Sequence, residues 1–156
     1  MQRATRLLLV PLACFALEAN ANASRSVAAL AELTILGPAR AQLGACASLH
    51  ADQAQEAGAA LNHLSSMVAE SLVALGTRRP AELDAQAPEA LFMHQQGLAR
   101  LYEADSQALS AERCAFLARD VRSITQAEIE SMVGDVVTQI TEASKAYQQG
   151  MERALQ

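Results

Sequence analysis

Aromatic residues are scarce in this sequence, whose 156 residues include two tyrosines, three phenylalanines and no tryptophan. Glycine and proline are also few, with seven and four copies. Strands favour aromatic and β-branched side chains, and the turns between strands use glycine and proline. Alanine, which has the highest helix propensity, occurs 34 times. The composition therefore predicts an all-α fold with a thin core, because each alanine buries little apolar surface.

The motifs of several large classes of enzyme and cofactor protein are absent. The sequence has no Cys-x-x-Cys, His-Glu-x-x-His, Gly-x-Ser-x-Gly or phosphate-binding loop, and it lacks the Glu-x-x-His pairs of di-iron bundles. No motif pairs any of its three histidines with a nucleophile. We therefore expect a non-enzymatic protein and assign it no cofactor.

The first 23 residues have the order of a secretory signal peptide. Two arginines precede an uncharged run of 11 residues, 7–17, and the small-x-small sequence Ala21-Asn22-Ala23 follows. Because a bilayer-spanning helix needs about 20 apolar residues, we expect no transmembrane span. We predict cleavage after Ala23, with Ala21 as the other candidate, and an exported chain in the periplasm or outside the cell.

Two other readings of this end remain open. Lipid attachment at Cys14 would tether the protein to a membrane; Ala13 suits such a site, whereas Pro11 and Leu12 do not. Alternatively, the segment is an amphipathic first helix of the fold, although 11 uncharged residues in a row are unusual for an exposed helix.

Removal of the leader changes the cysteine count from three to two, leaving Cys46 and Cys114. Two cysteines in an oxidising compartment predict a disulfide. The bond would close a loop of about 68 residues, and in the chain-entropy model such a bond contributes roughly 4 kcal/mol. An intermolecular bridge or two free thiols are the alternatives.

The mature chain is acidic. Removal of Arg3, Arg6 and Glu18 leaves 10 basic and 16 acidic residues, a net charge of −6. Nucleic acids and anionic lipids both require basic patches, so we expect neither as a partner.

A proline-bounded linker, residues 77–87, divides a single predicted domain, 24–156, into two helical halves, 24–76 and 88–156. Each half holds one of the two remaining cysteines. We predict an antiparallel bundle of four to five helices in which the disulfide joins the halves.

Glycine and proline suggest the helix ends of the first half. Gly37-Pro38 should end or kink a first helix, because proline lacks an amide hydrogen and restricts the residue before it. Residues 38–75 then form one helix or two with a bend near Ala51. Gly76 should close this region as a C-terminal cap.

Capping signals divide the second half. Pro88 opens one helix, Ser110 can cap the next, and Thr125 with Glu128 has the pattern of a capping box. The last helix carries a heptad pattern typical of a coiled coil, made by Ile129, Val133, Val136, Ile140, Ala143, Tyr147 and Ala154. We expect this seam to pack on the chain's own helices, and homodimerisation through it stays open.

Two small groups of residues are candidate sites. His63 and Met67 lie one helical turn apart, and with His94 they could hold Cu(I) or a non-covalent haem. A solvated His63 and a core Met67 are the plainer interpretation. The Arg78-Arg79 doublet could bind a carboxylate or phosphate of a partner, or simply be solvated.

We therefore predict an exported, non-enzymatic helical protein that binds a protein partner in a bacterial cell envelope, as an adaptor, inhibitor or assembly accessory. The bacterial origin is inferred from the leader and the Ala/Arg-rich composition. A periplasmic metal- or haem-binding bundle is the alternative.

Overall fold

The structure is a computed structural model, and it describes residues 25–156. The predicted signal peptide, Cys14 and the cleavage site lie outside the described residues. Six α-helices and two short 3-10 turns follow one another in this part, which contains no strand. They are α2 (Val27–Leu49), a 3-10 turn (Ala51–Gln53), α3 (Ala54–Arg78), α4 (Pro80–Leu83), α5 (Glu89–Asp105), a second 3-10 turn (Ser106–Ala108), α6 (Ala111–Ser123) and α7 (Gln126–Ala154). The prediction of an all-α fold is confirmed.

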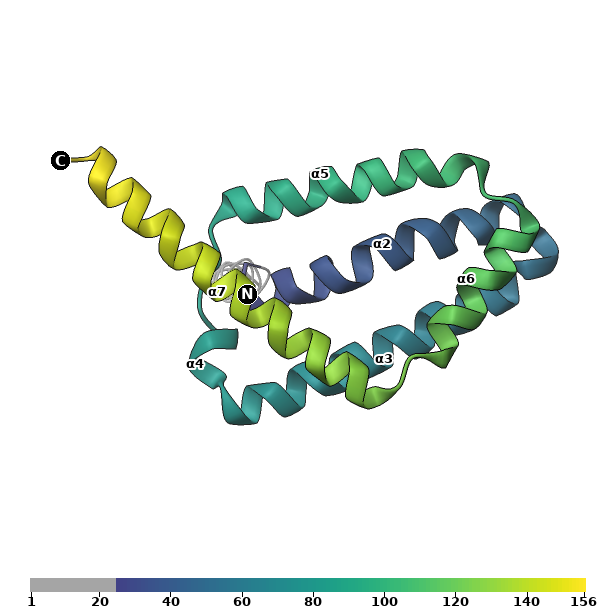
Figure 1. Cartoon of the computed structure of the whole chain (residues 1–156), viewed down its shortest axis with the longest axis horizontal. Coiled ribbons are helices and arrows are strands. Elements are labelled where there is room, and N and C mark those ends of the chain that lie inside the picture. Colours follow the sequence, from purple (N-terminus) through teal and green to yellow (C-terminus); the bar gives the residue numbers. More distant parts are fainter. Residues whose placement is uncertain (1–24) are drawn as a thin grey trace, which may run out of the picture.

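The chain makes four passes whose directions alternate (Figure 1). Helix α2 runs one way and α3 returns beside it. Helix α5 runs in the direction of α2 and packs chiefly against it, and α6 and α7 together make the last return against α2 and α3 (Figure 1). Helix α2 is therefore the central element, because it contacts every other long helix.

Of the two alternatives predicted for Gly37-Pro38, an end or a kink, the helix end is wrong, since α2 continues through Pro38. An interior proline costs a backbone hydrogen bond and about 3 kcal/mol. A continuous helix keeps Leu30, Leu36 and Leu43, which lie on both sides of the proline, fully buried. Each buried leucine contributes about 1.5–3 kcal/mol, so their burial together outweighs the lost bond.

The chain breaks instead at His50, where the backbone is extended. The 3-10 turn that follows reverses the direction of the chain before α3 begins. Of the two alternatives predicted for residues 38–75, the break near Ala51 is therefore confirmed.

The prediction for Gly76 is also wrong. Helix α3 continues to Arg78, and Gly76 has no positive φ angle. The following proline, Pro80, restricts Arg79 and ends the helix. A Cβ atom at Gly76 would lie 3.4 Å from Leu83 Cδ1 of α4, which is ordinary van der Waals contact.

Side-chain caps start three helices, and those at Ser110 and Thr125 are where the sequence predicts them. Ser26 Oγ accepts from the amide of Ala29 at 3.2 Å, and Ser110 Oγ accepts from Arg113 at the same distance. Thr125 and Glu128 form the complete capping box at the start of α7. Each cap satisfies amide groups that the first helical turn leaves unpaired.

The predicted linker, 77–87, is a folded part of the structure. It includes the last residues of α3 and all of α4, and it buries Leu83 and Ala87. Two backbone bonds join its end to the start of α2: Val27 donates to the carbonyl of Ala85, and Ala87 donates to that of Arg25, both at 2.9 Å. The linker thus fixes the start of α2.

The core has a large and a small part. The large cluster joins the first half of α2 to α3, α4 and the first half of α7. The small cluster surrounds the disulfide and consists of Leu43, Cys46, Ala57, Ala60, Cys114, Leu117 and Ala118. Three of its seven members are alanines, so this end of the molecule has the thin core expected from the composition.

The buried face of α7 differs in part from the predicted seam. Its buried residues are Ile129, Val133, Val137, Ile140 and Ser144. Val137 and Ser144 replace the predicted Val136 and Ala143, and the steps between the five buried residues are four, four, three and four. From Ile129 to Ile140 the spacing is that of an 11-residue repeat, which follows a straight helix more closely than a strict heptad does. The remaining predicted members, Tyr147 and Ala154, are exposed. Packing on the chain's own helices therefore ends near Ser144.

Candidate functional site

A disulfide joins α2 to α6. Cys46 and Cys114 are bonded, their Cα atoms are 5.5 Å apart, and both side chains are almost fully buried. The predicted pairing, and its role in joining the two halves, is confirmed. The buried position marks this as a structural bond, because a reactive cysteine needs access to solvent.

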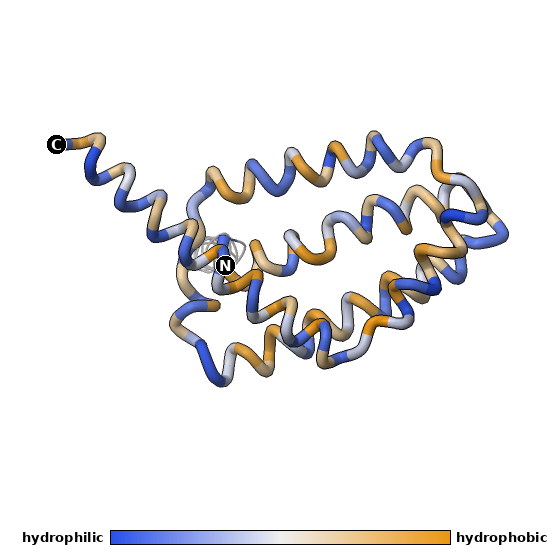
Figure 2. Tube along the Cα trace, viewed as in Figure 1, coloured by the Kyte–Doolittle hydropathy of each residue, from blue (hydrophilic) through white to orange (hydrophobic). Residues whose placement is uncertain are grey.

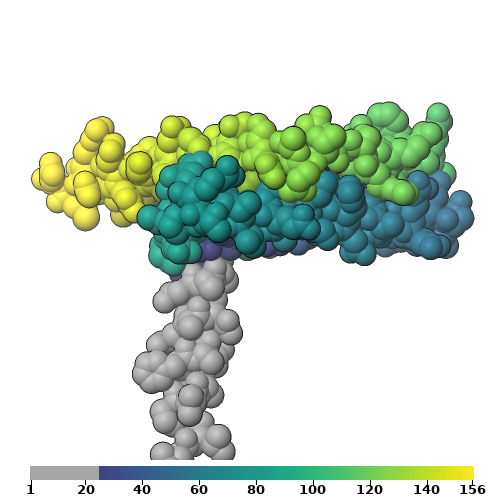
Figure 3. All heavy atoms as spheres, turned by 90° about the horizontal axis from the view of Figure 1, so that it is seen from below, coloured from purple at the N-terminus to yellow at the C-terminus, as the bar shows by residue number. Residues whose placement is uncertain are grey.

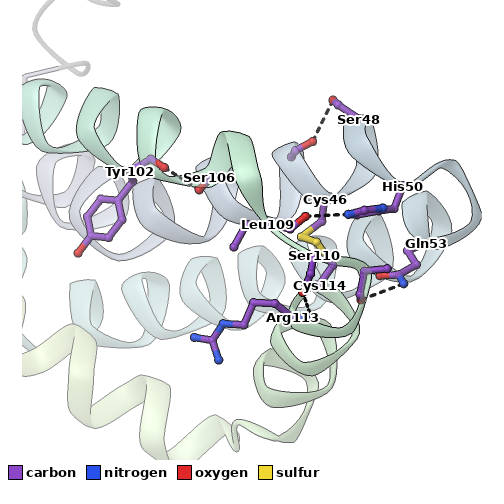
Figure 4. The surroundings of a disulfide bond; sticks show 12 residues. Cys46, Ser48, His50, Gln53, Tyr102, Ser106, Leu109, Ser110, Arg113 and Cys114 are labelled. Carbon is purple, nitrogen blue, oxygen red and sulfur yellow. Dashed lines mark hydrogen bonds between the residues drawn. A yellow bond between two sulfur atoms is a disulfide. The ribbon is translucent and has the colours of Figure 1, made fainter.

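Two hydrogen bonds lie on either side of the disulfide and connect the same two parts of the chain (Figure 4). The imidazole Nε2 of His50 donates to the carbonyl of Leu109 at 2.8 Å. The side-chain amide of Gln53 donates to the carbonyl of Ala111 at 3.0 Å. This corner, where α2 turns into α3, is thus attached at three points to the start of α6 and the residues just before it.

The arginine doublet has two different environments. Arg79 donates through Nε to Glu82 at 2.8 Å and through Nη2 to Glu82 and to Thr138 Oγ1, which is 3.0 Å away. The paired carboxylate raises the pKa of Arg79, and the guanidinium lowers the pKa of Glu82. Arg79 therefore connects α3, α4 and α7. Arg78 is exposed at the end of α3, so it is the member of the pair that can reach a partner.

The proposed His/Met ligands lie on different faces. His63 is exposed on α3, whereas Met67 is buried in the large cluster. His94 is exposed on α5 and lines a hollow beside α2 and α7 that includes neither of the other two residues. No group of three His, Cys, Asp or Glu side chains in the part that the structure describes could hold a metal ion. The arrangement thus gives the metal or haem alternative no common site.

Helix α5 presents the most unusual surface in the described part of the molecule. None of its 17 residues is buried. Leu91, Phe92 and Leu98 are half-buried on the side that packs against α2. Met93 and Leu101 lie on the opposite side, and each is 62% exposed.

The outward side of α5 is an uncharged stripe. At 100° per residue, its members fall within one sector of the helix. They are Ala90, Met93, His94, Gly97, Leu101 and Ala104, and all are exposed. We call these six residues the α5 stripe. Figure 2 shows apolar and polar positions alternating along this helix.

No helix among residues 25–156 combines the length and the apolar character that crossing a bilayer requires. Comparison with known proteins finds no family model, no curated protein and no solved structure that matches this chain. The candidate surface therefore depends on the geometry alone.

Sequence reasoning missed the α5 stripe. Leu91, His94, Leu98 and Leu101 recur at spacings of three and four, which is typical of one apolar side, although Leu101 is 62% exposed and lies away from α2. The small residues Ala90, Gly97 and Ala104 recur at intervals of seven, and this spacing is the signal that could have identified the second side.

Proposed function

We propose that this chain is an exported, non-enzymatic protein of the bacterial cell envelope that binds a helical segment of a partner protein through the α5 stripe. The single observation that carries the proposal is the outward side of α5, an uncharged surface with two large apolar side chains on a helix none of whose residues is fully buried. Adaptor, inhibitor and assembly accessory are the roles that suit such a surface.

The composition of the α5 stripe suits a helix as the partner. Small residues every seventh position let a second helix approach closely, and Met93 and Leu101 can anchor between its side chains. Methionine adapts to different apolar surfaces because its side chain is unbranched and flexible. Glu89 and Arg100 lie beside the stripe, and their charges could select the orientation of the partner.

The disulfide supports export. Such bonds persist in oxidising compartments and are rare in the cytosol. The predicted leader would direct the chain to export. The fold begins directly after it, because Arg25, two positions after the predicted cleavage site, is already hydrogen-bonded to the linker.

Site-specific photocrosslinking tests this function. A photoreactive amino acid at Leu101 should capture one defined envelope protein in cells, and Met93→Asp should abolish that capture. Val73, which is 71% exposed on α3, is the matched control for an exposed apolar position. Because Met93 is exposed, the aspartate variant should keep its helical circular dichroism spectrum and its melting temperature.

Three outcomes would count against the proposal. They are equal capture from Leu101 and Val73, capture that survives Met93→Asp, and retention of the intact N-terminus in the cytosolic fraction. The first two would reject the α5 stripe as the binding surface, and the third would reject export.

A further inference from the structure

Helix α7 extends beyond the rest of the molecule. Its last buried residue is Ser144, and every residue from Lys145 onward is exposed. Figures 1 and 3 show this end projecting past α3 and α4. The 10 residues from Lys145 to Ala154 correspond to about 15 Å of helix. We call residues 145–155 the α7 tail.

One side of the α7 tail is apolar and uncharged. Tyr147, Met151 and Leu155 follow at intervals of four, and they are 44%, 49% and 83% exposed. The charged residues of this region point to the other half of the helix, more than 90° from that line. They are Glu142, Lys145, Glu152 and Arg153.

The apolar side of the tail leads directly into a hollow of about 150 Å³ between α2, α5 and α7. On α7, Val136, Ile140 and Ala143 line this hollow, and Tyr147 comes next at the same spacing. The other lining residues are Leu30, Thr34, Leu91, His94, Gln95 and Gln139. None of them is an acid, a lysine or an arginine, so an apolar side chain can enter without burying an unpaired charge.

We propose that two copies of this chain form a dimer in which their α7 tails pack antiparallel and the end of each tail reaches the edge of the hollow of the other copy. The register follows from the positions of the exposed side chains. In an antiparallel pair centred on position 149, Tyr147 of one copy lies opposite Met151 of the other. Leu155 then lies opposite Ala143, at the edge of the hollow.

This arrangement explains why a second copy of the chain, and not another protein, packs on the α7 tail. The tail and the hollow are continuous on one helix, so each copy supplies both halves of the contact, and two-fold symmetry closes the assembly. The aromatic ring of Tyr147 also gains a favourable contact with the sulfur of Met151. A parallel pair would place each residue beside the same residue of the other copy, and neither tail end would reach the other copy's hollow.

The dimer makes no use of Met93 or Leu101, the two large apolar residues of the α5 stripe, because neither of them lines the hollow. Of the stripe, only His94 does. Failure of one proposal therefore leaves the other standing, and Met93→Asp should not change the oligomeric state.

Sedimentation of the mature protein, residues 24–156, over a wide concentration range tests the dimer. We expect a monomer–dimer equilibrium whose dissociation constant rises about tenfold or more in Met151→Asp, because a carboxylate would be buried without a partner. Val73→Asp is the matched control and should leave the constant unchanged. Both substituted side chains are exposed, so the melting temperature at low concentration should change little.

Cysteine pairing tests the register separately. An equimolar mixture of Tyr147→Cys and Met151→Cys chains should oxidise mainly to the mixed dimer, since positions 147 and 151 face each other. A mature protein that stays monomeric at every concentration would overturn the proposal, as would a dimer that tolerates Met151→Asp. Predominance of the two like-with-like dimers would reject the antiparallel packing.

Discussion

Loss of the disulfide should destabilise this protein strongly without changing its fold. The two cysteines are 68 positions apart, and in the chain-entropy model a loop of that length contributes roughly 4 kcal/mol. The small cluster around the bond has little to replace it, because its other members are two leucines and three alanines. A typical domain has a free energy of unfolding of only about 5–15 kcal/mol.

The corner where α2 turns into α3 should nevertheless stay attached to the start of α6 after the disulfide is reduced. The bonds from His50 to Leu109 and from Gln53 to Ala111 remain, and each contributes about 0.5–1.5 kcal/mol. Their sum is smaller than the contribution of the disulfide. We therefore expect the reduced protein to be native-like and to melt at a temperature lower by on the order of 10–20 °C.

Calorimetry of the oxidised protein, the reduced protein and the double variant Cys46→Ala/Cys114→Ala measures this shift. All samples need the same protein concentration, since dimerisation also raises the melting temperature. The reductant should not affect the double variant. If the oxidised and reduced proteins melted within a few degrees of each other, the loop-closure argument would be refuted.

Three further predictions concern single positions, and equilibrium urea unfolding measures each. The capping bond from the Thr125 amide lowers the pKa of Glu128, so its contribution is present above the ordinary glutamate pKa of 4.5 and is lost as the pH falls through the lower folded value. Glu128→Gln should therefore be less stable than wild type at neutral pH, and a difference that persisted unchanged below pH 4.5 would contradict this reasoning. Pro38→Ala should restore a helical amide hydrogen and raise the free energy of unfolding by up to about 3 kcal/mol, whereas a loss of stability would show that the ring packs favourably. Gly58→Ala and Gly134→Ala should each add about 0.5–1 kcal/mol, because a Cβ atom at either position meets nothing within 4 Å, and destabilisation of both would show that these helices need glycine.

The local features of the fold could be read from short stretches of sequence. Caps at Ser26, Ser110 and Thr125 depend on a side chain and an amide three positions later, and both partners are visible in the sequence. The pairing of Cys46 with Cys114 follows from counting cysteines under the prediction that Cys14 leaves with a cleaved leader.

The candidate surfaces could not be predicted in the same way. Whether Leu101 of α5 faces α2 or solvent depends on which neighbour covers each side, and periodicity marks an apolar side without saying what covers it. Likewise, the heptad pattern continues smoothly past Ser144 to Tyr147, although packing on the other helices stops between them.

By itself, the sequence determined the helical class, the caps and the disulfide, because composition, local hydrogen bonds and cysteine number set these. Only the tertiary structure decided that α2 runs through Pro38, that Gly76 lies inside α3, and which residues of α7 are buried. Each of these depends on contacts between distant segments, whose burial free energy exceeds the local preference of a single residue.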